Sequence, residues 1–121
     1  AEAQSIIDDH SKLNDGQISG DIIQGDLLND DIAKLIDSVI NHPKVVEYGG
    51  LFALINNASI YQPISFSDLS FEEFKKNFTI HVDVPFLLTK GLYDSLKAKS
   101  GSVIGIVDTS QKDIQPIKLT F

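Results

Sequence analysis

Two apolar segments that do not alternate with polar residues constrain the fold of this chain most. They are LFALIN, residues 51–56, and SVIGIVD, residues 102–108. Continuous apolar runs of this length are typical of parallel strands that are covered on both faces. Helices are predicted before and between these runs, and alternation of strands with helices is typical of an α/β fold. We therefore expect an α/β fold built on a parallel sheet.

An amphipathic helix is predicted before the first apolar run, within the segment NDDIAKLIDSVINHP. Its apolar residues recur three and four positions apart, which places them on one side of a helix. They are Ile32, Leu35, Ile36, Val39 and Ile40. Asn29 or Asp30 is expected to cap the start of this helix. Pro43 is expected to limit its end.

A longer helix is predicted between the two apolar runs. Ser70 and Glu73 have the spacing of a capping box, and the helix is expected to continue to about Lys97 before Gly101 breaks it. Pro85 lies inside this helix and has no N–H group. We therefore expect a kink that frees the carbonyl of His81, four residues earlier.

The N-terminal part of the chain predicts one more helix and one more strand. Residues 1–13 have a helical pattern, and the Asn-Asp-Gly sequence at residues 14–16 ends it as a turn. A short strand is expected around Ile22 and Ile23, closing on Asp26. The chain then holds about three strands and three helices of a doubly wound parallel sheet. It has the organisation of the middle of a larger domain.

Polar residues follow each of the three predicted strands. They are Asp26, the pair Asn56–Asn57, and Asp108. In open α/β sheets ligands bind at the carboxyl ends of the strands, where these residues fall. Each also has a purely structural alternative, because Asp and Asn commonly terminate strands as turns or caps.

Composition excludes several classes of function. The chain has 121 residues, with 10 basic and 17 acidic side chains and a net charge of −7. An acidic chain without a basic stripe argues against a nucleic-acid partner. No apolar run approaches the length of a membrane span. The absence of cysteine excludes thiolate metal sites and fits a cytoplasmic protein. No three His, Asp or Glu residues have metal-ligand spacing, so we expect no metal.

The segment Asn56-Asn57-Ala58-Ser59 resembles the Asn-Asn-Ala-Gly element of the short-chain dehydrogenase/reductase family. The resemblance covers essentially the whole chain. Asp26-Leu27 is similar to the pair that holds the adenine ring in this family. Residues 74–90 are similar to the long helix that usually carries an active-site Asn, and residues 102–108 to the strand that usually ends on the catalytic Ser.

Departures from the family pattern point to a subgroup. Ser59 replaces the usual Gly, Asp108 stands at the catalytic Ser, and His81 stands at the helix Asn. Together with Tyr61, these residues resemble pteridine reductases and dihydromonapterin reductases. The resemblance implies that Tyr61 stacks on a pterin and that Asp108 works in proton delivery with a Tyr and a Lys. It also implies that the His81 backbone carbonyl holds a water in the proton relay, and that Ser59 faces both cofactor and substrate.

The same resemblance implies NADPH as the cofactor, with NADH not excluded. The expected cofactor-binding residues are Asp26, Leu27, Asn57, Ala58 and Ser59. The expected reaction is hydride transfer to a C=N bond of a pterin or folate-like ring. One alternative is a reductase that acts on an ordinary carbonyl compound, in which Tyr61 has no stacking role. The other alternative is a non-catalytic binding subunit. Such enzymes often pair subunits through the long helix around Phe86, so a homodimer or homotetramer is expected.

Two elements of the family pattern are missing from residues 1–121. The Gly-rich phosphate turn should precede residue 1, and the Tyr-x-x-x-Lys element should follow the strand that ends on Asp108. The usual family spacing from Asp108 ends on Phe121. Either Phe121 replaces the catalytic Tyr, or that Tyr comes directly after it. We expect residues 1–121 to be part of a single Rossmann domain and to be inactive alone.

Overall fold

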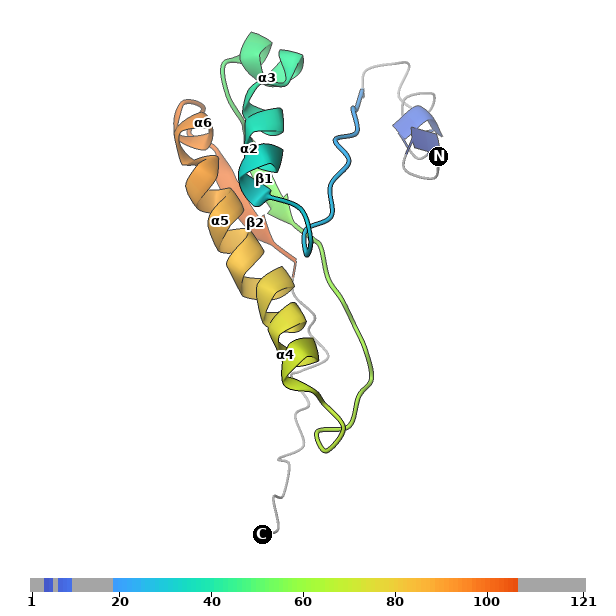
Figure 1. Cartoon of the computed structure of the whole chain (residues 1–121). Helices are drawn as coiled ribbons and strands as arrows, with labels where there is room; N and C mark the ends of the chain where they lie inside the picture. Colours follow the sequence, from blue (N-terminus) through green and yellow to red (C-terminus); the bar gives the residue numbers. More distant parts are fainter. Residues whose placement is uncertain (1–3, 6, 10–18, 107–121) are drawn as a thin grey trace.

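The computed structural model describes residues 4–5, 7–9 and 19–106. Within them, β1 (Ala53–Asn56) and β2 (Ser102–Gly105) pair in parallel, with Ala53 opposite Ser102 and Asn56 opposite Gly105. Figure 1 shows helices α2 and α5 lying over this sheet. The predicted α/β class with a parallel sheet is therefore confirmed, and the structure shows that the two apolar runs pair directly.

Helix α2 (Ile32–Ile40) forms where the amphipathic pattern predicted it, but its cap differs. Asp31 is the N-cap, and its Oδ1 accepts a hydrogen bond from the Ala33 N–H at 3.0 Å. The predicted caps, Asn29 and Asp30, are therefore wrong. The carboxylate of Asp30 instead accepts from the backbone N–H of Asp26 at 2.6 Å.

Pro43 starts a new helix, α3 (Pro43–Tyr48), two residues after the Asn41 that ends α2. Proline is well tolerated in the first turn of a helix, where its missing N–H would have no partner. His42 caps α3, with its Nδ1 accepting from the Lys44 N–H at 3.4 Å. Pro43 thus separates two helices, which agrees with its predicted role as a limit.

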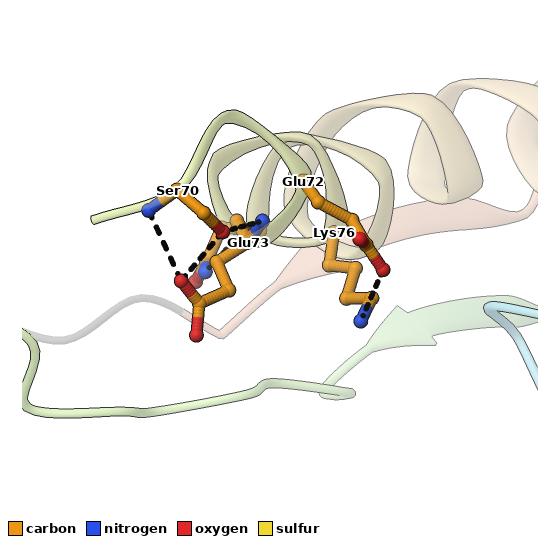
Figure 2. Close-up of polar contacts among 5 residues, drawn as sticks. Ser70, Glu72, Glu73 and Lys76 are labelled. Carbon is orange, nitrogen blue, oxygen red and sulfur yellow. Dashed lines mark hydrogen bonds and ion pairs between the residues drawn. The ribbon is translucent and has the colours of Figure 1, made fainter. Parts of the chain in front are cut away.

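The long predicted helix is present as a rod of four consecutive elements that ends at Lys97, as expected. They are α4 (Phe71–Phe78), η1 (Thr79–Asp83), α5 (Val84–Gly91) and α6 (Tyr93–Lys97). The capping box is confirmed (Figure 2): the Glu73 N–H donates to Ser70 Oγ at 3.2 Å, and the Ser70 N–H donates to Glu73 Oε2 at 3.1 Å. The Glu72–Lys76 ion pair, at 2.9 Å, supports the same turn.

A π-helix, η1, stands directly before Pro85. The Val84 N–H donates to the carbonyl of Thr79, five residues earlier rather than four. Pro85 cannot donate to His81 as an α-helix would require. Where we expected a kink, the structure has a π-turn, and α4 and α5 continue as one rod (Figure 1). Such turns are frequent at functional sites.

The core lies along the inner side of the rod. Ile80, Val84, Leu92 and Leu96 are buried. On the neighbouring helix, Ile36 of α2 packs so closely on Gly91 of α5 that a β-carbon at Gly91 would clash with it. The glycine therefore allows α2 and α5 to pack together.

The strand predicted around Ile22 and Ile23 is wrong for the described residues. Residues 19–26 form no strand, and both isoleucines are exposed. In the described part of the chain the sheet consists of β1 and β2, which pair with each other, so residues 19–26 have no strand beside them to pair with. Ile55 of β1, expected to be covered, is 59% exposed.

The N-terminal prediction is described only in part. Residues 4–5 and 7–9 are helical, as expected. The remainder of that predicted helix and the turn at residues 14–16 lie outside the described residues. No helix within 19–106 or the short N-terminal stretches has both the length and the apolarity for crossing a membrane.

Candidate functional site

The carboxyl ends of β1 and β2 meet at one edge of the sheet. The Ile106 N–H donates to the Asn56 carbonyl at 3.0 Å, so the segments that follow β1 and β2 leave the sheet side by side. From this edge, residues 57–61 follow β1, and Ile106 follows β2. Of the three predicted strand ends, the structure places Asn56–Asn57 at this edge, and Asp108 lies outside the described residues.

Asn57, Ala58 and Ser59 are exposed at this edge. Neither polar side chain among them makes a hydrogen bond to another described residue, and Asn57 closes no Asx turn. The structural alternative for Asn57, a strand-terminating turn, is thus not what the structure contains. Its amide and the Ser59 hydroxyl remain available to a ligand.

Tyr61 extends from the same loop and is 87% exposed. Tyr61 is therefore not a packed tyrosine, and its exposure fits both a ligand-stacking residue and an ordinary surface tyrosine. A second aromatic of the loop, Phe66, is 86% exposed. Both rings present accessible flat faces, which is the property that stacking on a planar heterocycle requires.

His81 lies on η1, facing the loop that leaves β1. Its Nε2 is 3.4 Å from the carbonyl oxygen of Ile60, the residue between Ser59 and Tyr61. The side chain is exposed, so His81 is not a buried core histidine. Sequence reasoning assigned His81 a role through its backbone and missed this side-chain contact.

Asp26 stands apart from this edge and is exposed. Its Oδ1 accepts from the Leu28 N–H at 2.9 Å, and its Oδ2 accepts from the Asn29 side-chain amide at 2.8 Å. The bond from the Asn29 side chain, followed by that from Leu28, holds the pKa of Asp26 below its usual range. Leu27 is half-buried in the same turn. In the described part of the chain, no hydrogen bond links Asp26 to Asn57.

An open surface hollow of about 390 Å³ lies beside the turn that Asp26 forms. Gly25, Asn29, Lys34 and Ser38 contribute to its lining, and neither Asp26 nor Leu27 does. This hollow is therefore not the predicted adenine position.

Asp108 and Phe121 lie outside the described residues, so the structure leaves their predicted roles open. Within the residues that it does describe, no group of three His, Asp or Glu side chains could hold a metal ion.

A polar cluster that sequence reasoning missed ties the segment before α2 to α3. Lys44 Nζ lies 2.9 Å from Asp21 Oδ2 and donates to Ser19 Oγ at 3.1 Å. His42 Nε2 lies 3.5 Å from the same Asp21 oxygen. The hydrogen bond from Lys44 holds the pKa of Asp21 below its usual value. A His-Pro pair at a helix start was the available sequence signal, because residues before such a proline commonly serve as caps.

Comparison with known proteins identifies the family. The profile described as short chain dehydrogenase matches residues 8–117, nearly the whole chain. The chain belongs to the short-chain dehydrogenase family. One relative is a Thermotoga maritima protein described as an uncharacterized oxidoreductase. The two sequences are 36% identical over 75 residues. The match covers 61% of this chain and 29% of the relative.

Solved structures of short-chain dehydrogenases have the same fold. A Brucella ovis oxidoreductase, in complex with a partially ordered NAD, has a TM-score of 0.60 and 27% identity, covering 67% of this chain and 39% of that one. An NADPH-bound carbonyl reductase from chicken fatty liver has a TM-score of 0.67 and 21% identity. The match covers 93% of this chain and 46% of the chicken enzyme. This chain thus spans less than half of each of these two proteins.

Proposed function

We propose that this chain forms the central part of a Rossmann domain in an oxidoreductase that binds a nicotinamide cofactor. The observation that carries the proposal is the common edge at which β1 and β2 end, with Asn56 opposite Gly105. Ligands of open α/β sheets bind outside the carboxyl ends of the strands. Family membership supports the proposal, as do the NAD of the Brucella ovis neighbour and the NADPH of the chicken enzyme.

The residues present fit such a cofactor. Asn57 and Ser59 would bind the ribose side, since both are exposed at the strand edge, with Ala58 between them. Asp26 would accept from the adenine amine beside Leu27. A carboxylate has about four acceptor positions, and Leu28 and Asn29 take three of those on Asp26. One position is left, which suffices for an amine.

The proposed chemistry is hydride transfer coupled to delivery of a proton. Bound at this edge, the nicotinamide ring would supply the hydride. Asp108, two residues beyond Ile106, would hold the proton for the substrate nitrogen. The His81 carbonyl would orient a water of the relay, since Pro85 offers it no α-helical donor.

For the substrate we propose a pterin or folate-like ring, with NADPH as the preferred cofactor. Tyr61 supports this assignment, because its ring is exposed and it belongs to the segment that follows β1. An ordinary carbonyl compound is the second candidate substrate. The non-catalytic alternative applies if Phe121 occupies the position of the catalytic tyrosine.

Cofactor oxidation by the full-length protein that contains this chain tests the proposal. NADPH and NADH are each offered with a dihydropterin and with a simple aromatic aldehyde or ketone. Faster oxidation of NADPH with the dihydropterin is the expected result. Turnover with the carbonyl compound alone would overturn the pterin assignment, whereas no turnover with either substrate would favour the binding subunit.

The extent of the domain has its own test. The 121-residue chain, purified alone, should oxidise NADPH at the background rate, because the phosphate turn and the Tyr-x-x-x-Lys element lie outside it. The full-length protein is the matched control. Clear turnover by the short chain would contradict the proposal that it is only the central part of the domain.

Assembly into a homodimer or homotetramer is also proposed, from an exposed apolar stripe along the rod. Its side chains are spaced three, four or seven residues apart, which places them on one side of a helix. The outer stripe consists of Phe71, Phe74, Phe78, Val82, Phe86 and Tyr93. Phe86 and Tyr93 also line an open hollow. An exposed apolar stripe of this length is characteristic of an interaction surface.

A further inference from the structure

The His42 ring connects two segments that are separate in the sequence. Its Nδ1 accepts a hydrogen bond from the Lys44 N–H at 3.4 Å, and its Nε2 lies 3.5 Å from Asp21 Oδ2. Lys44 belongs to α3, whereas Asp21 lies in the segment before α2. The His42 side chain is 25% exposed, so most of it is covered by its neighbours. One imidazole thus holds the segment before α2 and the start of α3 together.

The two contacts identify the tautomer of the neutral ring. A ring nitrogen that accepts from a backbone N–H carries no hydrogen, so Nδ1 is bare. In a neutral imidazole the other nitrogen, Nε2, then carries the hydrogen, and it faces the carboxylate of Asp21, which only accepts. Neutral His42 therefore serves both partners at once, one as acceptor and one as donor.

The start of α3 depends on the acceptor side of this ring. α3 has six residues, and Pro43 in its first turn has no N–H. The Lys44 N–H is therefore the first backbone donor of the helix, and no carbonyl within the helix is placed to accept from it. The Val46 N–H already bonds the His42 carbonyl at 3.0 Å. Because so short a helix has few hydrogen bonds, the loss of one cap weakens a large part of it.

A proton on the His42 ring changes its two contacts in opposite directions. An imidazolium carries hydrogen on both nitrogens, so Nδ1 no longer accepts, and its N–H faces the N–H of Lys44. A positive charge at the N-terminus of a helix is also unfavourable, because the helix dipole is positive there. At Nε2 the contact with Asp21 becomes an ion pair and is strengthened.

The charged side chains in contact with the ring come from the two segments that it joins. They are Asp21 and Lys44, which form an ion pair with each other at 2.9 Å. From α2, the uncharged carbonyl of Val39 accepts from the His42 N–H at 3.1 Å. The pKa of Asp21 is lowered from 3.8, chiefly by the Lys44 hydrogen bond. Since histidine changes charge between about pH 5 and 8, Asp21 stays ionised while the ring titrates.

We propose that the cluster of Asp21, His42 and Lys44 is a pH-sensitive joint. At the upper end of the histidine range, neutral His42 holds both Asp21 and the Lys44 N–H. At the lower end, protonated His42 keeps Asp21 and releases the start of α3. α3 ends at Tyr48, shortly before β1 begins at Ala53. The joint goes beyond the proposed function and does not rest on it.

The first test reads the state of the ring in the full-length protein by nitrogen NMR. At about pH 8, Nδ1 of His42 should be bare and Nε2 should carry the hydrogen. As the pH falls to about 5, the amide shift of Lys44 should change with the same midpoint as the Nδ1 shift. A neutral ring with its hydrogen on Nδ1 would overturn the proposal. So would a Lys44 amide that does not respond while the ring titrates.

The second test measures how firmly the start of α3 is held. Protection of the Val46 amide from hydrogen exchange, corrected for the intrinsic effect of pH, should fall roughly fivefold between about pH 8 and 5, as for the loss of a helix cap. His42→Asn keeps a capping side chain that does not titrate, so its protection should stay constant. His81→Gln removes a histidine elsewhere and should behave as the parent does.

An equal fall of Val46 protection in His42→Asn and in the parent would overturn the proposal, because the change would then not depend on the imidazole. Constant protection in the parent would overturn it as well. The ring measurement needs no variant, so it decides the proposal even where His42→Asn fails to fold. Neither measurement uses a cofactor or a substrate, so both are independent of whether the proposed function is correct.

Discussion

Lys44 Nζ lies 2.9 Å from Asp21 Oδ2 and holds the segment before α2 against the start of α3. Lys44 belongs to α3, whereas Asp21 lies in a segment without regular secondary structure. The same lysine donates to Ser19, which fixes the segment at a second point. This contact thus sets where the chain enters the turn formed by Asp26, the proposed adenine contact.

The first prediction concerns the pH dependence of this ion pair. The pKa of Asp21 is lowered in the folded protein, chiefly by the Lys44 hydrogen bond. A lowered folded pKa adds stability above the usual value of 3.8, and that stability is lost as the pH falls below it. NMR titration of the Asp21 carboxyl carbon should give a midpoint under 3.8. Lys44→Met should raise this midpoint and Lys34→Met should not; equal midpoints in all three proteins would refute the prediction.

The second prediction concerns the capping box of α4. Ser70→Ala removes the acceptor for the Glu73 N–H and should destabilise the protein by about 1 kcal/mol. Urea unfolding at neutral pH measures the change. Ser38→Ala is the control, because the Ser38 hydroxyl bonds the Lys34 carbonyl within α2 and caps nothing. A loss for Ser38→Ala as large as that for Ser70→Ala would show that capping is not the cause.

The third prediction tests the stacking role of Tyr61. Tyr61→Ala should weaken pterin binding by at least roughly fivefold and leave NADPH binding unchanged, since an aromatic stack is worth on the order of 1 kcal/mol. Phe66→Ala is the matched control, as Phe66 is equally exposed on the same loop. Calorimetric titration with each ligand supplies the measurement. Equal effects of the two substitutions would remove the support for a pterin substrate.

The fourth prediction concerns Asp108. Asp108→Asn keeps the shape of the side chain but cannot carry a transferable proton. If Asp108 delivers a proton, kcat and kcat/KM should fall together while NADPH affinity is preserved. If Asp108 is only a turn cap, the melting temperature should fall and turnover should stay normal. Kinetics and thermal unfolding of this one variant decide between the two roles.

The fifth prediction concerns assembly. Phe86→Glu places a charge in the outer stripe and should shift the full-length protein towards monomer, because burying an unpaired charge in an apolar interface is costly. Sedimentation equilibrium measures the change. Phe66→Glu, on the loop, should leave the assembly intact. A Phe86→Glu protein that assembles normally would exclude the outer stripe as the subunit interface.

Local signals in the sequence predicted local structure well. The Ser70–Glu73 spacing predicted a cap that forms, and the continuous apolar runs predicted two strands of a parallel sheet. The cap depends on residues close in sequence, and each strand depends on its own run of apolar residues. The strand at Ile22 and Ile23 failed because a strand depends on a neighbour, which a sequence pattern cannot supply.

The candidate site was predicted unevenly for the same reason. The exposed residues after β1, which are Asn57, Ala58, Ser59 and Tyr61, follow from the strand end that the pattern located. The contact of His81 with Ile60 joins two segments that become adjacent only through folding. Asp31 caps α2, although Asn29 or Asp30 was predicted to do so. The choice among these adjacent residues depends on backbone angles, which the sequence does not specify.

The π-turn at Thr79–Asp83 makes the length of the rod as important as its composition. A π-turn contains one residue more than the α-helical turn it replaces, and each residue of an α-helix rotates the chain by about 100°. Because the wider turn takes up the extra residue, Phe86 and Tyr93 keep the direction of the aromatic residues of α4. If the same number of residues formed a regular α-helix, Phe86 and Tyr93 would be turned by about 100° relative to α4. The outer stripe is therefore continuous because η1 is a π-turn, and inserting one further residue there would divide it.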